Sequence, residues 1–181
     1  MAVSPGRDGA TTSSMGQRGK QAPGNVPGAT PTRVAAGQDR PAPDRVGPSV
    51  TVVIPTYDER ENLPVCIARV MALGDQFRVI VVDDHSPDGT GEVADALAVA
   101  YPGRVDVLHR PVKEGLGPAY LAGLRAALAT APDLVATMDA DLSHDPADLA
   151  RLAEAAAGAD LVLGSRYTRG GGTRGWPLYR R

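Results

Sequence analysis

The sequence predicts an α/β domain in which a mostly parallel sheet lies between layers of helices. From residue 50 onward, short apolar runs rich in β-branched residues alternate strictly with longer segments whose apolar residues recur at helical spacing. The short runs are apolar at nearly every position, as expected for strands that are covered on both faces. Alternating strands and helices joined by right-handed crossovers build a parallel sheet.

Five strands are predicted, each from a short apolar run. Pro55 is expected to stop the first strand, because proline has no backbone N–H to donate to a neighbouring strand. The predicted strands are Val50–Ile54, Phe77–Val82, Val105–Leu108, Leu134–Met138 and Asp160–Leu163.

Four helices are predicted, at about 62–73, 90–101, 116–130 and 146–157. Most begin at a side chain that can cap a helix: Asn62 for the first, Asp88 or Thr90 for the second, and Asp145 for the fourth. In the third helix, four apolar residues are expected on one face: Tyr120, Leu121, Leu124 and Leu128.

Residues 1–48 differ in composition from residues 49–181. They contain seven Pro and eight Gly but no Leu, Ile or aromatic residue. Such a segment cannot bury enough apolar area to offset its ordering entropy, so we expect a disordered tail before a single domain. Six basic and three acidic residues give the tail a charge of +3, which leaves −5 for residues 49–181. The tail lacks the apolar region of a secretory signal.

The single cysteine, Cys66, excludes an internal disulfide framework and suits a reducing compartment. Its neighbours Leu63, Ile67 and Val70 lie at helical spacing, so Cys66 is predicted to be a small core residue. No stretch approaches the roughly 20 apolar residues of a membrane span. The chain as given is therefore expected to be soluble or peripheral.

Acidic residues gather where predicted strands end. Asp83 and Asp84 follow the second strand, Asp139 and Asp141 follow the fourth, and residues 55–61 after the first are also polar. Ligands of open α/β sheets bind beyond the carboxyl ends of the strands. A hard divalent cation prefers oxygen ligands, and a metal–nucleotide complex suits an acidic cleft that would repel a bare anion. These carboxylates are therefore predicted to meet such a ligand.

Structural roles remain open for the same residues. The segment from Asp83 to Gly89 is rich in turn-forming residues, and an isolated Asp-x-Asp can simply cap a helix. The three histidines, His85, His109 and His144, do not share a metal-ligand spacing and are expected on the surface or in loops. His144 is the exception, because it lies beside Asp141.

Five sequence blocks resemble family 2 glycosyltransferases in order and spacing over Val50–Arg181. The subgroup they resemble most is the dolichyl-phosphate (polyprenol-phosphate) mannosyltransferases. The blocks are VVIPTYDERENL at 52–63, VVDDHSPDGT at 81–90, GLGPAY at 115–120, MDADLSH at 138–144 and GSRY at 164–167.

The resemblance implies a GT-A (Rossmann-like) fold and inverting, metal-dependent transfer of mannose from GDP-mannose to a polyprenyl phosphate. It also implies peripheral contact at the cytoplasmic face of a membrane, and no nucleic-acid partner is expected. Another nucleotide sugar, with glucose or N-acetylhexosamine, stays an alternative, as does a catalytically silent nucleotide-binding fragment. Relatives continue with further helices, so the chain is expected to be incomplete at its C-terminus.

The resemblance assigns a guanosine pocket residue by residue. Pro55, Tyr57 and Glu59 are similar to residues that frame the guanosine. Val82 and Asp83 are similar to the second part of the pocket, where Asp83 would accept a hydrogen bond from an N–H of the base.

The resemblance also implies a diphosphate and metal site at Asp139, Ala140 and Asp141, for Mg²⁺ or Mn²⁺. Asp141 would be the main metal ligand, and Asp139 would be shared between the metal and the ribose. Ser143 is the third candidate ligand, at a position where many relatives have Gln.

Arg166 and Arg180 resemble the arginines that engage the donor diphosphate and the acceptor phosphate, and Arg166 joins Asp139 and Asp141 as a predicted catalytic residue. Planar guanidinium groups suit phosphate. A phosphate monoester has a second pKa of about 6 and is already a nucleophile near neutral pH, so no Ser-His-Asp relay is required. The main tasks are positioning and electrostatic screening.

Other classes fit less well. A dinucleotide-binding oxidoreductase would carry Gly-x-Gly-x-x-Gly after the first strand, whereas Gly115 and Gly117 follow the third and Tyr120 replaces the last Gly. A calcium loop would need Gly at His144. A phosphosugar nucleotidyltransferase is the better enzymatic rival, although it usually has a Gly-rich loop after the first strand. A silent nucleotide-binding module is the non-enzyme alternative.

Overall fold

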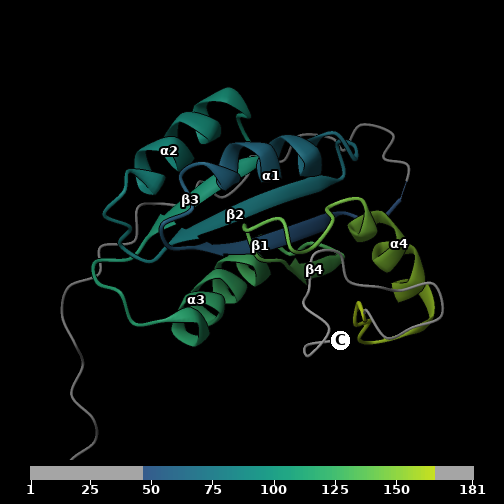
Figure 1. Ribbon diagram of the computed structural model, residues 1–181. Helices are drawn as coiled ribbons and strands as arrows, with labels where there is room; N and C mark the ends of the chain where they lie inside the picture. Colours follow the sequence, from purple (N-terminus) through teal and green to yellow (C-terminus); the bar gives the residue numbers. More distant parts are fainter. Residues whose placement is uncertain (1–46, 166–181) are drawn as a thin grey trace, which may run out of the picture. The chain divides into compact units, whose positions relative to one another are not determined.

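The computed structural model describes residues 47–165 (Figure 1). The predictions for the N-terminal tail fall almost entirely outside the described residues, as do those for Arg166 and Arg180.

The described part of the chain forms a four-stranded parallel sheet in the order β3-β2-β1-β4. The register places Val50 opposite Phe77 and Thr56 opposite Asp83, so β1 and β2 end at the same level. The carboxyl ends of these strands therefore form one rim, as predicted. The strands are β1 (Val50–Thr56), β2 (Phe77–Asp83), β3 (Val105–His109) and β4 (Leu134–Thr137).

β1 continues through Pro55 to Thr56, beyond its predicted end. Successive residues of β1 direct their backbone N–H and C=O groups in turn toward β2 and toward β4. The Thr56 carbonyl accepts a hydrogen bond of 3.0 Å on the β2 side, and the Val53 carbonyl accepts one of 3.1 Å from Met138 on the β4 side. Pro55 alternates to the β4 side, where registered pairing has already ended at Val53. Its missing N–H therefore removes no bond from the ladder with β2.

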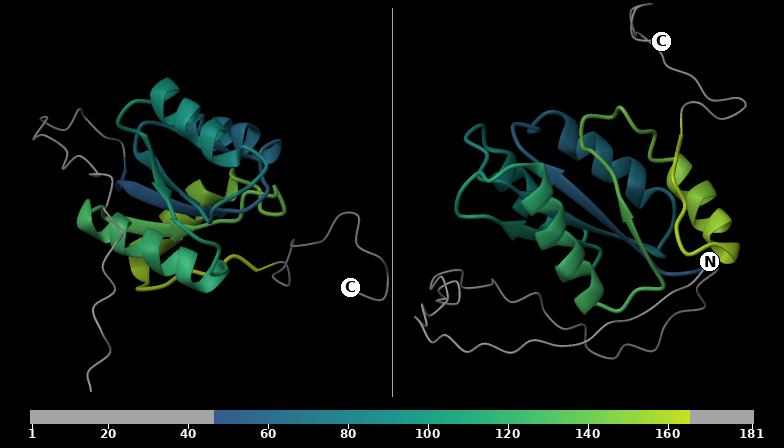
Figure 2. Two further views of the ribbon diagram at one scale, coloured as in Figure 1. Left: turned by 90° about the vertical axis from the view of Figure 1, so that its left-hand side faces the viewer. Right: turned by 90° about the horizontal axis from the view of Figure 1, so that it is seen from below.

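Helices cover both faces of the sheet, which confirms the predicted layers. In Figure 1, α1 and α2 lie on one face and α3 lies on the other. The right-hand view of Figure 2, seen from below, shows α3 lying across that second face. α4 passes into a short 3₁₀ turn, Ala156–Gly158. The helices are α1 (Asn62–Met71), α2 (Thr90–Ala100), α3 (Leu116–Ala129) and α4 (Asp148–Ala155).

None of the predicted cap residues occupies the N-cap position of its helix, which is Glu61 for α1, Gly89 for α2 and Ala147 for α4. Two of them instead hold the turn before the helix. The Asp88 carboxylate accepts hydrogen bonds from the Thr90 backbone N–H (2.9 Å) and hydroxyl (2.6 Å), and the Asp145 carboxylate accepts one from the Ala147 N–H (3.1 Å). Asn62 lies inside α1, as its first residue. Its side-chain amide instead donates to the Glu59 carboxylate at 2.9 Å.

The sheet separates two clusters of buried apolar residues. The cluster on the α1 and α2 face contains Cys66, which is fully buried as predicted. Burial raises the pKa of the Cys66 thiol to about 11, so the thiol stays protonated at neutral pH. The cluster on the α3 face is smaller and consists of Val53, Ile80, Val82, Ala119 and Ala127.

The buried face of α3 matches the predicted one only in part: Tyr120 and Leu124 pack against the smaller cluster as predicted. Leu121 and Leu128 are exposed, whereas the small residues Ala119, Gly123 and Ala127 face the sheet. A Cβ placed on Gly123 would lie 2.3 Å from Cγ1 of Val53 and 2.8 Å from Cγ2 of Val82. Only small side chains at i, i+4 and i+8 allow the helix to approach a sheet of β-branched residues so closely.

The predicted fifth strand, Asp160–Leu163, is absent from the described residues. Leu161 and Leu163 are 75% and 76% exposed, and these residues pair with no strand of the sheet. Alternation of apolar residues indicates strand propensity, but a strand forms only where a partner satisfies its backbone groups.

Candidate functional site

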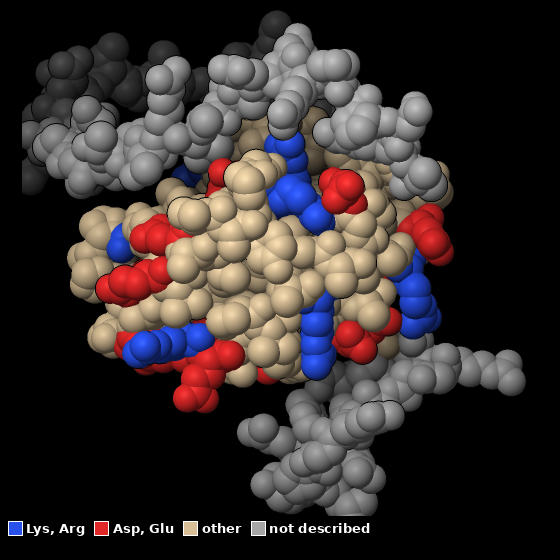
Figure 3. Space-filling view, turned by 90° about the horizontal axis from the view of Figure 1, so that it is seen from above, with Lys and Arg blue, Asp and Glu red and all other residues tan. Residues whose placement is uncertain are grey.

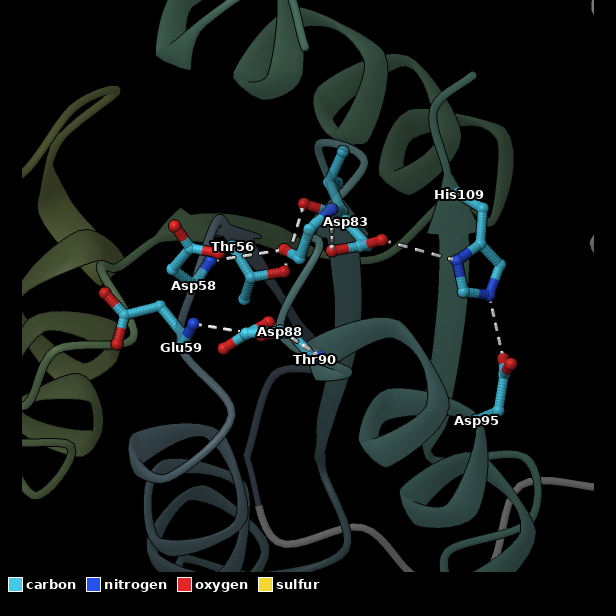
Figure 4. A network of polar contacts seen from close by, with 10 residues as sticks. Thr56, Asp58, Glu59, Asp83, Asp88, Thr90, Asp95 and His109 are labelled. Atoms are coloured by element: carbon cyan, nitrogen blue, oxygen red, sulfur yellow. Dashed lines mark hydrogen bonds and ion pairs between the residues drawn. The ribbon is translucent and has the colours of Figure 1, made fainter. Parts of the chain in front are cut away.

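The rim formed by the carboxyl ends of β1 and β2 brings two predicted site segments together. The Asp84 backbone N–H donates to the Thr56 carbonyl at 3.0 Å, which continues the ladder one residue beyond β2. The loops after the two strands are also joined, because the Asp58 N–H donates to the Ser86 hydroxyl (3.3 Å) and the Glu59 N–H donates to the Thr90 hydroxyl (3.0 Å). Figure 4 shows this network.

Asp83 is buried at the end of β2, with only 5% of its surface exposed. Its carboxylate accepts a hydrogen bond of 3.3 Å from the Ser86 N–H and lies 3.7 Å from Nδ1 of His109. The other ring nitrogen of His109 lies 2.9 Å from Asp95 on α2 (Figure 4). A histidine thus bridges the predicted base-reading carboxylate and a second acid, which sequence analysis did not foresee.

The electrostatic setting of His109 favours its charged form. Burial acts to lower the pKa of His109, but the carboxylates of Asp95 and Asp83 outweigh it and raise the pKa above its usual value. Both ring nitrogens face carboxylates, and only the imidazolium form carries a proton on each. His109 therefore lies beside Asp83 in a setting that favours the protonated form of its ring.

Asp84, the neighbour of Asp83, has a structural role. It is 4% exposed and forms a buried ion pair with Arg110, which also contacts Glu114. Its carboxylate accepts hydrogen bonds from the backbone N–H groups of Glu114 (3.4 Å) and Gly115 (2.9 Å). Gly115 has a φ of 95°, a conformation that favours glycine. Asp84 therefore anchors the loop before α3, a structural role that differs from the base-binding role predicted for Asp83.

Tyr57 lies half-buried in the loop after β1 and is covered by a cation. The Lys113 ammonium lies 3.2 Å from the centroid of the Tyr57 ring, which is cation–π geometry. Lys113 belongs to the loop that Asp84 anchors. A lysine thus covers the ring of one of the predicted guanosine residues, and the sequence pattern had not indicated this lysine.

Two predicted site residues have buried side chains that face the core. Val82 packs in the α3-side cluster and is fully buried, and Ala140 is 2% exposed in the other cluster. Pro55 is also buried, opposite Val82 in the register of the strands. Contacts of Val82 and Ala140 with a ligand would therefore use their backbone groups.

Asp139 and Asp141 follow β4 in a tight loop. The Tyr120 hydroxyl of α3 donates to Oδ1 of Asp139 at 2.7 Å, and the Ser143 N–H donates to Oδ1 of Asp141 at 2.9 Å. Leu142, the residue after Asp141, has a φ of 61°, a left-handed conformation that is uncommon for leucine. The loop therefore turns sharply at the Asp-x-Asp pair.

His144 closes the same loop, because its Nδ1 accepts a hydrogen bond of 3.5 Å from the Asp139 N–H. Partial burial acts to raise the pKa of Asp141, but hydrogen bonds from Ser143 and the attraction of His144 outweigh it. The pKa of Asp141 consequently lies below its usual value, so this exposed carboxylate is ionised at neutral pH.

The donor atoms of this loop fit a hard divalent cation. Mg²⁺ is usually held by one or two carboxylates together with substrate phosphates, rather than by an all-protein cage. Asp139 and Asp141 supply two carboxylates. Within residues 47–165, no three or more His, Cys, Asp or Glu side chains form a ready metal cluster. Phosphate oxygens of a bound ligand would complete the coordination.

The acidic character of the rim is local. Over the face that α1 and α2 form, acidic and basic side chains are interspersed among uncharged ones (Figure 3). At the rim, by contrast, acidic residues follow β1, β2 and β4. Besides burial, the charges of Glu59 and Asp141 help to raise the pKa of the Cys66 thiol. In the described part of the chain, no helix is both long and apolar enough to cross a membrane.

This combination of a parallel α/β sheet and an acidic, oxygen-rich rim defines an α/β domain suited to a metal–nucleotide ligand. The model of glycosyl transferase family 2 matches residues 51–181, and the chain belongs to that family. The predicted GT-A fold class and the predicted transferase family are thereby confirmed.

Curated relatives share the sequence of this domain. The chain is 53% identical over 146 residues to a polyprenol monophosphomannose synthase of Mycolicibacterium smegmatis, covering 80% of this chain and 55% of that protein. It is 49% identical over 132 residues to an undecaprenyl-phosphate mannosyltransferase of Micrococcus luteus, covering 73% and 54%. It is 42% identical over 135 residues to a dolichol-phosphate mannosyltransferase of Pyrococcus furiosus, covering 73% and 37%. The chain thus spans about half the length, or less, of these relatives.

Proposed function

We propose that this chain carries the donor-binding domain of a mannosyltransferase that moves mannose from GDP-mannose to a polyprenyl phosphate. The observation that carries the proposal is the Asp139-x-Asp141 pair on the same strand-end rim as Asp83. The names of the three relatives, all of which concern phosphomannose or mannosyl transfer to a polyprenol-type lipid, support mannose and the lipid phosphate.

The proposed donor site divides into two parts. Asp83 would accept a hydrogen bond from a guanine N–H, with Tyr57 and Glu59 framing the nucleoside. Asp139 and Asp141 would hold Mg²⁺ or Mn²⁺ against the diphosphate, with Ser143 contributing to the same loop. The pKa of Asp141 supports its share of this role, because a carboxylate must be ionised to ligate a cation.

The proposed chemistry is a single displacement. An oxygen of the acceptor phosphate forms a bond to the anomeric carbon of mannose while the bond from that carbon to GDP breaks, which inverts the configuration. The bound cation would neutralise the charge that develops on the leaving diphosphate. A dianionic acceptor phosphate needs no general base, so the rim residues act by binding and orientation.

The acceptor side belongs to the same proposal. Arg166 and Arg180, both outside the described residues, are proposed to bind the donor diphosphate and the acceptor phosphate. Because a polyprenyl phosphate is embedded in a membrane, the proposed site of action is a cytoplasmic membrane face, reached by peripheral contact.

The metal half of the proposal can be tested with one substitution and a matched control. Asp141→Asn removes the charge of the main proposed ligand, and we expect a loss of about 100-fold or more in Mn²⁺-dependent affinity for GDP-mannose, measured by calorimetry. Asp148→Asn is the control, because Asp148 is an exposed acid on α4 that pairs with Arg151. Unchanged Mn²⁺-dependent affinity in Asp141→Asn would refute the metal assignment.

The base half of the proposal needs a different ligand pair. Asp83→Ala should weaken binding of GDP much more than binding of pyrophosphate, since only GDP presents a base. Equal losses for both ligands would show that Asp83 acts structurally. Mannose transfer to a short polyprenyl phosphate, compared with transfer from nucleotide sugars that carry glucose or N-acetylhexosamine, then tests the sugar itself.

A further inference from the structure

The block from Gly115 to Tyr120 contributes no residue to the donor site described above, yet it ends on a direct contact with that site. The Tyr120 hydroxyl, on α3, donates a hydrogen bond of 2.7 Å to Oδ1 of Asp139, in the loop after β4. We propose that Tyr120 is a positioning residue that fixes the Asp139 carboxylate for the metal. This inference rests on the proposed function, which makes Asp139 a ligand.

The place of Tyr120 is set at two points along α3. Where the helix begins, buried Asp84 accepts the Gly115 N–H at 2.9 Å and thereby ties the start of α3 to the end of β2. Further along, Gly123 allows the helix to lie against Val53, because no Cβ intervenes. Tyr120 lies between these two anchors. The packing of the helix therefore holds the backbone that carries the Tyr120 side chain in place.

The chemistry of the contact suits a supporting role. The phenolic hydroxyl of Tyr120 is a hydrogen-bond donor, and at 2.7 Å it donates to Oδ1 of Asp139. A carboxylate has two oxygens, and a donor on Oδ1 fixes its rotation while Oδ2 stays available as a ligand atom. Such outer partners orient metal ligands, and their loss usually lowers metal affinity about 10- to 100-fold.

The experiment removes the hydroxyl alone. In the full chain, Tyr120→Phe should weaken GDP binding in the presence of Mn²⁺ by about 10-fold, equivalent to about 1.4 kcal/mol. GDP binding measured with EDTA instead of Mn²⁺ should change less than twofold, because the base pocket is untouched. Tyr101→Phe is the matched control: Tyr101 is also half-buried, at the end of α2, and both measurements should match those of the unsubstituted chain.

A double-substitution cycle with Asp139→Ala separates the possible failures. If Tyr120 acts through Asp139, adding Tyr120→Phe to Asp139→Ala should cause no further loss of Mn²⁺-dependent affinity. Equal losses with Mn²⁺ and with EDTA would overturn the inference, since they would indicate a general structural role. A loss in Asp139→Ala without one in Tyr120→Phe would overturn it too. No loss in Asp139→Ala would overturn the proposed metal site, and this inference with it.

Discussion

Removing one partner of the buried ion pair between Asp84 and Arg110 should destabilise the fold strongly. Asp84 is 4% exposed and Arg110 9%, and the carboxylate also accepts two backbone N–H groups of the loop before α3. Asp84→Ala would leave the Arg110 charge buried. Breaking a buried pair costs about 3–5 kcal/mol. Because Arg110 keeps its contact with Glu114, whose side chain is 58% exposed, we expect about 3 kcal/mol, near the low end of that range.

Urea denaturation followed by circular dichroism measures this free energy of unfolding. For a domain of this size, a loss of about 3 kcal/mol lowers Tm by roughly 10 °C. Asp75→Ala is the matched control, because it breaks an aspartate–arginine pair with Arg104 in which the Asp75 side chain is 89% exposed. Such an exposed pair contributes about 0–1 kcal/mol. If Asp84→Ala cost no more than Asp75→Ala, the reasoning from burial would be refuted.

Two further predictions concern helix packing and pH. Gly123→Ala should lower the free energy of unfolding by about 1 kcal/mol, because overpacking against Val53 outweighs the gain in helix propensity. Gly117→Ala is the control: its Cβ would meet nothing within 4 Å, so the same urea titration should show no change or a gain in stability. Equal effects of the two substitutions would contradict the close packing of α3. Asp95 on α2 and Asp83 on β2 raise the pKa of His109 in the folded protein. The charged form of His109 should therefore stabilise the fold fully at a pH below its unfolded pKa of about 6.5. This stabilisation should be lost as pH rises through the folded pKa. The stability difference between the unsubstituted chain and His109→Gln, measured from pH 5.5 to 9, should therefore shrink as pH rises, and a constant difference would count against the bridge.

Much of the fold could be predicted from local patterns. The runs at β1 to β4 are apolar and β-branched, and turn or cap residues separate them from helices, so strands, helices and their order follow from the sequence. The position of the acids at the strand ends was likewise predictable, because parallel strands in α/β domains bring their carboxyl ends to one rim.

Errors arose where pairing or packing partners decide. Asp160–Leu163 has an apolar pattern but no strand partner among the described residues. α3 has leucines that suggest an apolar face, yet its small residues face the sheet, because a close helix–sheet approach depends on the facing side chains. Pro55 remains within β1 because its backbone faces β4, and the registered pairing of β1 with β4 has already ended at Val53.

Sequence alone determined the class of fold, the family and the set of acidic candidates, since these depend on residue types and their order along the chain. The tertiary structure decided how those candidates differ. It turned Asp84 into an anchor for Arg110, placed His109 beside Asp83, and brought Tyr120 to Asp139. These partners lie between 19 and 26 positions apart in sequence. The physical reason is that hydrogen bonds and ion pairs act over a few ångströms in space, and only the folded packing of helices on the sheet sets which side chains come that close.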